Sequence, residues 1–145
     1  MHDRVIVLVE DNANDEELTL RAFRKSSISN RVVVLRDGAE ALDYFFCRGS
    51  YAGRPTSDIV QVVLLDLKLP KIDGLAVLRA LRADDRTKLI PIVILTSSAE
   101  DQDLVRGYGL GANSYVRKPV DFTQFVEAVR QLGLYWLVIN QAAPA

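Results

Sequence analysis

The chain has 145 residues, of which 49% are hydrophobic and 26% are charged, a composition that fits one folded globular domain and excludes a mainly disordered chain. Its formal net charge is −1, from 18 lysines and arginines against 19 aspartates and glutamates, so nothing draws it generally to nucleic acid or to an anionic membrane. With Cys47 as its single cysteine, the chain cannot form an internal disulfide, and the apolar neighbours of Cys47 indicate a small core residue. The apolar run at 5–9 is too short for a signal peptide or a membrane span. We therefore expect a cytoplasmic protein.

Apolar runs alternate with amphipathic segments along the chain. In chain order, we expect a strand at 5–9, a helix at 15–26, a strand at 31–35, a helix around 41–46, a surface loop at 49–61, a strand at 62–66, a helix at 74–84, a strand at 91–95, a helix carrying Leu104, Val105 and Tyr108, a strand at 114–117 and a helix from about 122 past Leu137. The first run, VIVLV, is apolar at every position, which is typical of a strand covered on both faces.

Alternation of strand and helix predicts an α/β fold. Strands separated by helices pair in parallel, and right-handed crossovers then place helices on both faces of the sheet. We therefore expect a doubly wound sheet of five parallel strands with five helices in three layers. The sequence shows no repeat, linker or second domain, so we treat 1–145 as one domain with a core at about 4–133 and a helical extension at about 134–140.

Polar residues follow the predicted strands at the point where each strand ends. The first strand is followed by Glu10 and Asp11, the third ends at Asp66, the fourth is followed by Thr96 and the fifth by Lys118. Ligands of such sheets bind beyond the carboxyl ends of the strands, so we expect these five side chains to share one rim. The polar pair after the second strand, at 36–37, has no assigned role.

Three carboxylates at close range repel one another unless a cation joins them. An incomplete cage of oxygen ligands suits Mg²⁺, with water completing the coordination. A carboxylate oxygen can also act as a nucleophile toward phosphorus. Mg²⁺ and Lys118 would stabilise the charge on the transferring phosphoryl oxygens, and Thr96 could donate a hydrogen bond to the product.

Four motifs carry a resemblance to a known family. They are VLVEDN at 7–12, LLDLKLPKIDG at 64–74, ILTSS at 94–98 and YVRKP at 115–119. Together they resemble the receiver domains of two-component response regulators, and the single-domain chemotaxis type in architecture. The resemblance spans residues 4 to about 133 and implies the flavodoxin-like strand order 2-1-3-4-5.

The resemblance also implies roles at the acidic end of the site. Asp66 matches the phosphoacceptor, and Glu10 and Asp11 match the acidic pair that orients Mg²⁺. Lys68 holds the position whose backbone carbonyl completes the metal site. The pair is Glu-Asp here rather than Asp-Asp, a variant that leaves the metal role intact.

Further implied roles concern signalling. Thr96 matches the switch hydroxyl, Tyr115 the aromatic residue that turns inward with it, and Lys118 the invariant lysine, whose bond to Pro119 is expected to be cis. The long loop and the LGLYWL segment at 132–137 resemble the subgroup that partners bacterial and cyanobacterial phytochrome kinases.

The expected function is a phosphorylation-controlled switch. A sensor histidine kinase or phosphotransfer protein would supply the phosphoryl group, and the face formed by the fourth helix, fifth strand and fifth helix would change shape. Output would be protein binding, onward phosphotransfer or dimerisation through that face and the terminal helix, where Trp136 and Leu137 suit either a dimer contact or the core. The protein would catalyse only its own phosphorylation and dephosphorylation.

Other interpretations of the same residues remain open. Residues 10–12 could only cap a helix, Thr96 and Ser97 could do the same, and Tyr115 could be a static surface aromatic. A phosphatase of the haloacid dehalogenase type is disfavoured because Lys68 stands where that family has a second aspartate. A pseudo-receiver would need a broken acidic pocket, and a nucleotide-binding module would need a glycine-rich loop after the first strand.

Overall fold

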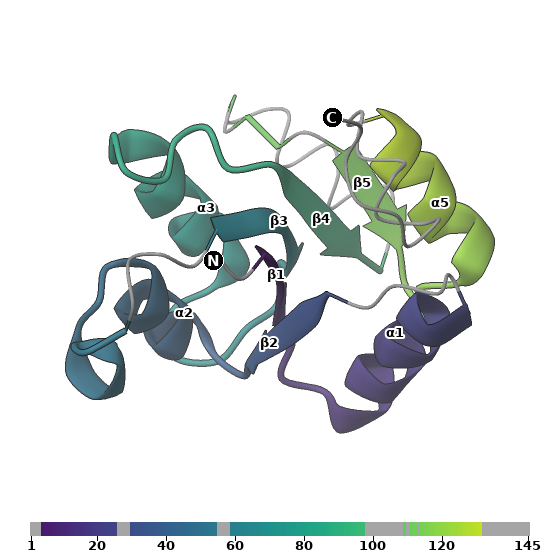
Figure 1. The fold of residues 1–145 in the computed structure, drawn as a ribbon, viewed down its shortest axis with the longest axis horizontal. Coiled ribbons are helices and arrows are strands. Elements are labelled where there is room, and N and C mark those ends of the chain that lie inside the picture. Colours follow the sequence, from purple (N-terminus) through teal and green to yellow (C-terminus); the bar gives the residue numbers. More distant parts are fainter. Residues whose placement is uncertain are drawn as a thin grey trace.

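The computed structural model describes residues 4–25, 30–54, 59–97, 109, 111–112 and 114–131. Within them the elements follow in the order β1 (Arg4–Val9), α1 (Ala13–Lys25), β2 (Arg31–Leu35), α2 (Gly38–Phe45), the 3₁₀ turn η1 (Gly49–Tyr51), β3 (Ile59–Asp66), α3 (Gly74–Ala83), β4 (Ile92–Thr96), β5 (Ser114–Arg117) and α5 (Phe122–Gln131). Figure 1 shows one twisted sheet with helices on either side of it.

The five strands form one parallel sheet in the order β2-β1-β3-β4-β5. Each parallel neighbour must be reached by a crossover, which the intervening helices provide. The order reverses direction next to β1, and this reversal is the switch point at which α/β sheets of this kind bind ligands. The doubly wound, flavodoxin-like fold predicted from the sequence is confirmed.

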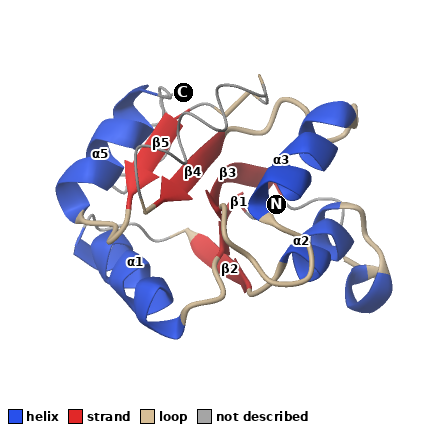
Figure 2. Cartoon of the chain, turned by 180° about the vertical axis from the view of Figure 1, so that it is seen from behind, coloured by secondary structure: helices blue, strands red, loops and turns tan. Residues whose placement is uncertain are grey.

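Alternate residues of the central strands point into two separate hydrophobic cores, one on each face of the sheet. Odd-numbered residues of β1 pack in one core against α2 and α3. Even-numbered residues of β1 pack in the other core against α1 and α5. Figure 2 shows these two pairs of helices on opposite sides of the sheet. The apolar residues at every position of β1 are explained by this double coverage.

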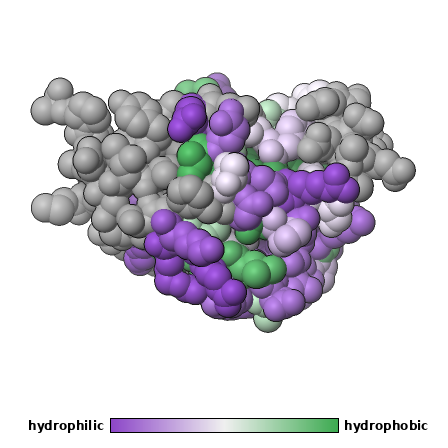
Figure 3. Space-filling model, turned by 90° about the vertical axis from the view of Figure 1, so that its right-hand side faces the viewer, coloured by the Kyte–Doolittle hydropathy of each residue, from purple (hydrophilic) through white to green (hydrophobic). Residues whose placement is uncertain are grey.

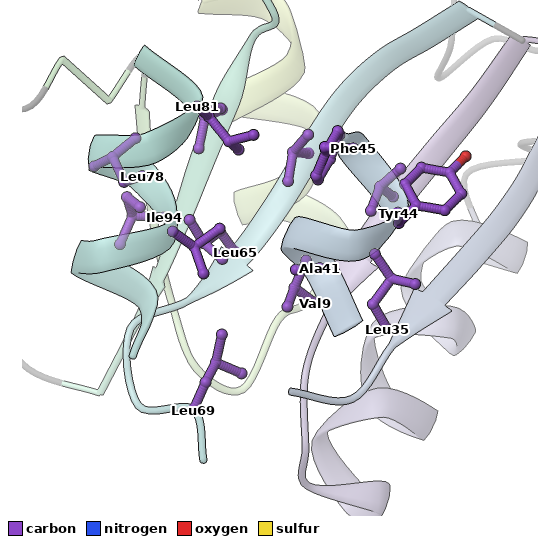
Figure 4. Packing of buried hydrophobic residues seen from close by; sticks show 14 of the residues in the cluster. Val9, Leu35, Ala41, Tyr44, Phe45, Leu65, Leu69, Leu78, Leu81 and Ile94 are labelled. Atoms are coloured by element: carbon purple, nitrogen blue, oxygen red, sulfur yellow. The ribbon is translucent and has the colours of Figure 1, made fainter. Parts of the chain in front are cut away.

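The core under α2 and α3 is closely packed. Figure 4 shows side chains of the strands directed toward those of the two helices, among them Val9, Leu35, Leu65 and Ile94 against Ala41, Phe45, Leu78 and Leu81. Leu78 and Leu81 are fully buried, and each such side chain stabilises the fold by roughly 2 kcal/mol. This packing fixes α3, whose first turn follows the loop after Asp66.

The segment before the third strand differs from its prediction as a loop at 49–61. It begins with η1, and β3 starts at Ile59, three residues before the expected start at Val62. The glycine, serine and proline residues that indicated a loop all precede Ile59, whereas Val60 pairs with Val5 and Val62 with the adjacent Ile6. Gln61 is thus an extra residue in the strand, which interrupts the alternation that sequence patterns detect.

Cys47 is also placed differently from the prediction of a core residue. It is half-buried and follows α2 with a φ of 53°, in the turn that ends the helix. The apolar residues before it face the core, but the chain has turned outward by residue 47.

Some expected elements lie outside the described residues. These are the helix carrying Leu104, Val105 and Tyr108, and the end of the last helix with Trp136 and Leu137. None of the helices among the described residues has the length and apolar character that a membrane crossing requires. The described surface on the α1 and α5 side is mostly hydrophilic, with small hydrophobic spots (Figure 3).

Candidate functional site

The carboxyl ends of three strands meet the start of the β5–α5 loop at one edge of the sheet. Glu10 follows β1, and its amide donates a hydrogen bond to the carbonyl of Leu35 at 2.9 Å. Asp66 and Thr96 end β3 and β4, and the amide of Lys118 donates to the carbonyl of Thr96 at 2.7 Å. Backbone pairing therefore brings these four residues together, as the sequence predicted.

Lys118 is the centre of the site. Its Nζ lies 2.9 Å from Oδ2 of Asp66, 3.0 Å from Oδ2 of Asp15 and 3.1 Å from Oε1 of Glu10. The lysine side chain is 14% exposed, that of Glu10 is 0% and that of Asp66 is 4% exposed. Ion pairs this well buried are screened much less by salt than surface pairs.

Three carboxylates form a group that could hold a metal ion. Oxygen atoms of Glu10, Asp11 and Asp66 all lie within 4.8 Å of one another. The first and last are buried, and Asp11 is exposed, so the group opens toward solvent on one side. Buried oxygen donors with an open side fit a hard divalent cation that keeps part of its water shell.

The electrostatics of the group also fit a cation. Burial, then the hydrogen bond and the negative charge of Asp66, raise the pKa of Glu10 to about 8, although Lys118 acts against this rise. Burial alone would lower the pKa of Lys118, but hydrogen bonds to Asp66 and Asp15 and the surrounding negative charge raise it above its ordinary value. A carboxyl whose pKa is raised by burial and by a neighbouring carboxylate lies where a further positive charge would be favourable.

The loop after Asp66 holds this carboxylate from its other side. The amide of Lys68 donates a hydrogen bond to Oδ1 of Asp66 at 3.0 Å, and the amide of Gly74 donates to the carbonyl of Leu67 at 2.9 Å. A Cβ atom at Gly74 would lie 2.2 Å from the carbonyl oxygen of Asp66. The glycine lets the start of α3 approach Asp66 this closely.

Helix capping is carried out by other residues than the acidic pair. Asn12 caps α1, since its Oδ1 accepts a hydrogen bond from the amide of Asp15 at 2.9 Å. Asp37, the residue after β2 left without a role, caps α2, and Asp73 caps α3. Of residues 10–12, Asn12 does cap the helix, as the alternative interpretation proposed, whereas Glu10 and Asp11 lie in the acidic group.

Thr96 has a buried hydroxyl with no hydrogen-bond partner among the described residues. Its side chain is 1% exposed, and its Oγ1 makes no hydrogen bond within the described part of the chain. Such an atom costs free energy unless a ligand or water satisfies it, which points to a group that binds at this edge. Ser97, the other candidate cap here, is exposed.

Tyr115 and Pro119 complete the predicted residues. Tyr115 is half-buried on β5 and packs against the core under α3, next to a hollow also lined by Thr123 and Gln124 of α5. The peptide bond between Lys118 and Pro119 is cis, as expected from the resemblance.

Asp15 is the one residue of the site that sequence reasoning missed. The sequence placed it only at the start of the expected helix at 15–26, and its pairing with Lys118 spans 103 positions of the chain. Only its place in the first turn of α1, four residues after Asp11, could have pointed to it.

Comparisons with known proteins agree with this geometry. The bacteriophytochrome response regulator AtBRR is 56% identical, with 94% of this chain and 96% of that chain covered and a TM-score of 0.86. The response regulator Rcp1 of Synechocystis is 34% identical over 92% of this chain and 89% of its own length, and a Mn²⁺-bound form of Rcp1 has been solved (TM-score 0.74). The phosphorylated cyanobacterial phytochrome response regulator RcpA is 35% identical, with full coverage of both chains and a TM-score of 0.74.

The family profile of the response regulator receiver domain matches residues 6–130, which include all four sequence motifs and the whole acidic site. Together with the strand order and the convergence of Glu10, Asp66 and Lys118, this match identifies the chain as a member of the response regulator receiver domain family.

Proposed function

We propose that this protein is a single-domain response regulator that accepts a phosphoryl group on Asp66. The observation that carries the proposal is the position of Asp66, whose two carboxylate oxygens are held by the amide of Lys68 and the ammonium of Lys118 beside two further carboxylates. A carboxylate fixed in this way can attack phosphorus without first having to be oriented.

In the transfer step, one carboxylate oxygen of Asp66 forms a new O–P bond. The P–N bond of a phosphohistidine, or the P–O bond of a small acyl phosphate, breaks at the same time, and the donor leaves with the electron pair. Lys118 stabilises the negative charge on the phosphoryl oxygens from 2.9 Å away from the nucleophile. The buried hydroxyl of Thr96 donates a hydrogen bond to the phosphoryl group once it is in place.

A divalent cation, Mg²⁺ under cellular conditions, is the cofactor of this proposal. Glu10, Asp11 and Asp66 would hold it, with the backbone carbonyl of Lys68 as a fourth protein ligand. When bound, it would neutralise charge on the phosphoryl oxygens. The Mn²⁺-bound form of Rcp1 supports the binding of a divalent cation by this chain.

The partner that supplies the phosphoryl group is a sensor histidine kinase of the bacteriophytochrome type, directly or through a phosphotransfer protein. The 56% identity to AtBRR and the phosphorylated state of RcpA support this assignment. Phosphorylation draws Thr96 toward the phosphate, Tyr115 follows, and the face that includes β5 and α5 changes. Output is the binding of a protein partner or of a second copy through this face.

Intact mass after incubation with acetyl phosphate tests the phosphoacceptor. We expect a gain of one phosphoryl group with Mg²⁺, a much smaller gain with a chelator, and none in Asp66→Asn. Asp85→Asn is the matched control, because this carboxylate is 93% exposed and pairs only with Lys88 among the described residues. A phosphoryl group that persists in Asp66→Asn would disprove the assignment.

Two further measurements test the partner and the output. A bacteriophytochrome-type kinase autophosphorylated on histidine should transfer to this chain within seconds, and an unrelated histidine kinase should transfer far more slowly. Size measurement with and without beryllofluoride tests dimerisation, and an unchanged mass would remove that part of the proposal.

A further inference from the structure

Asp15 is the one carboxylate at Lys118 that does not belong to the metal-binding group. Lys118 contacts Glu10, Asp15 and Asp66, and two of these also lie among the three carboxylates that could hold a cation. Oδ2 of Asp15 lies 3.0 Å from Nζ, as close as the other two partners. The side chain of Asp15 is 28% exposed, so most of its surface is withdrawn from water.

The start of α1 fixes Asp15 at this place. Asn12 accepts a hydrogen bond from the amide of Asp15 at 2.9 Å, and the hydroxyl of Thr19 donates to the carbonyl of Asp15 at 2.9 Å. The backbone amide and carbonyl of Asp15 are therefore both hydrogen-bonded within α1, and its side chain extends from there to the β5–α5 loop. A carboxylate held this way loses little further freedom on pairing with Lys118.

We propose that Asp15 is a positioning residue that keeps the ammonium of Lys118 on the phosphoryl side of Asp66. This inference rests on the function proposed above and adds a residue to it. The ammonium has three donors, which the three carboxylates now share. A bound cation would be coordinated by Glu10 and Asp66, and the phosphoryl group would be attached to Asp66. Asp15 would therefore remain as the carboxylate that pairs with Lys118 alone.

The charge balance agrees with this role. Asp15 places a negative charge 3.0 Å from the ammonium of Lys118, whose side chain is only 14% exposed. Without Asp15, the flexible lysine side chain would have no fixed partner once Asp66 is esterified, and stabilisation of the transferring group would be lost in part.

Phosphorylation kinetics with acetyl phosphate test the proposal. For Asp15→Asn we expect the maximal rate at saturating donor and Mg²⁺ to fall about fivefold, with little change in the half-saturating donor concentration, because Lys118 acts on the transition state. Asp15→Glu should restore most of the rate. Glu17→Gln is the control, since it removes the same charge from the exposed face of α1, where Glu17 pairs with Arg24.

A background without the lysine separates positioning from other effects. In Lys118→Ala, the added Asp15→Asn substitution should leave the residual rate unchanged, because there is no ammonium to hold. An equal fall in both backgrounds, or an unaltered rate in Asp15→Asn alone, would overturn the proposal. If the wild-type chain gains no phosphoryl group, the proposed function is wrong, and so is this inference, which rests on it.

A spectroscopic readout in the metal-free protein is independent of activity. The lysine ammonium signals in a proton–nitrogen correlation spectrum should include a protected signal that vanishes in Lys118→Ala. Asp15→Asn should broaden or shift this signal, and Glu17→Gln should leave it in place. A Lys118 signal unchanged by Asp15→Asn would overturn the proposal even if the rate fell.

Discussion

Nζ of Lys118 and Oδ2 of Asp66 lie 2.9 Å apart, although 52 positions separate the two residues in the chain. The contact joins the loop after β5 to the end of β3, with β4 between them in the sheet. A single ammonium thus balances carboxylates that β1, β3 and α1 bring to one edge.

The first prediction concerns the lysine itself. Lys118→Ala leaves the buried carboxylates of Glu10 and Asp66 without their cation, and we expect the metal-free protein to lose about 3 kcal/mol of unfolding free energy. Mg²⁺ should stabilise this variant more than it stabilises the wild type, because the ion then meets no competing ammonium. Urea unfolding with and without Mg²⁺ measures both effects.

Lys88→Ala is the control for that experiment. Its partner, Asp85, is 93% exposed, and we expect a change below about 0.5 kcal/mol, with or without Mg²⁺. Equal losses in the two lysine variants would contradict the central role of Lys118.

The second prediction separates stability from signalling at Thr96. Thr96→Val replaces a buried hydroxyl that has no partner within the described residues by a methyl group of similar shape, so the unfolding free energy should rise by about 1 kcal/mol. The phosphorylated state should lose its hydrogen bond, so beryllofluoride should perturb β5 less than in the wild type. Thermal unfolding and amide spectra provide the two measurements, and Thr96→Ser should keep the response. A clear fall in the stability of Thr96→Val would show that the hydroxyl already has a stabilising partner.

The third prediction concerns Gly74, which lies behind Asp66. Gly74→Ala places a methyl group about where the carbonyl oxygen of Asp66 and the Cα of Leu67 lie, at 2.2 and 2.6 Å. Since these are backbone atoms, they must move, and we expect a loss of about 3 kcal/mol together with slower phosphorylation of Asp66. Urea unfolding and intact mass measure the two losses.

Gly53→Ala offers a matched comparison, because no atom lies within 4 Å of the added methyl group. That variant should be as stable as the wild type or slightly more stable. A tolerated Gly74→Ala would mean that the loop between β3 and α3 can shift without disturbing the site.

The fourth prediction is a pH dependence at the start of α2. The hydrogen bond from the amide of Glu40, with a contribution from Lys71, lowers the pKa of Asp37 below its ordinary value of 3.8. A carboxyl whose pKa is lower in the folded state stabilises the protein above its unfolded pKa, and this contribution disappears as the pH falls through the folded value. Asp37→Ala should therefore cost about 1 kcal/mol near neutral pH.

Asp37→Asn keeps the cap but removes the charge. Its deficit relative to the wild type should be small near neutral pH and should vanish as the pH falls below about 4. Urea unfolding across this range measures the difference, and a deficit that grows toward acid would contradict the assigned sign.

Local patterns in the sequence determined the alternation of strands and helices, the two-sided coverage of VIVLV, and the residues that follow each strand. These features depend on the period of the apolar residues and on neighbours in the chain, so they can be recognised without a fold. The four motifs then identified Glu10, Asp11, Asp66 and Lys118 as one site, and the metal-binding group confirms that the carboxylates converge.

Only the tertiary structure decided which partners each of these residues has. The extra residue at Gln61 depends on pairing with β1. That the Thr96 hydroxyl has no partner within the described part of the chain depends on what surrounds a buried atom. Asp15 reaches Lys118 from the first turn of α1, where its amide also donates to the capping residue Asn12. Such contacts join distant parts of the chain through the sheet, so the spacing of apolar residues along the sequence does not predict them.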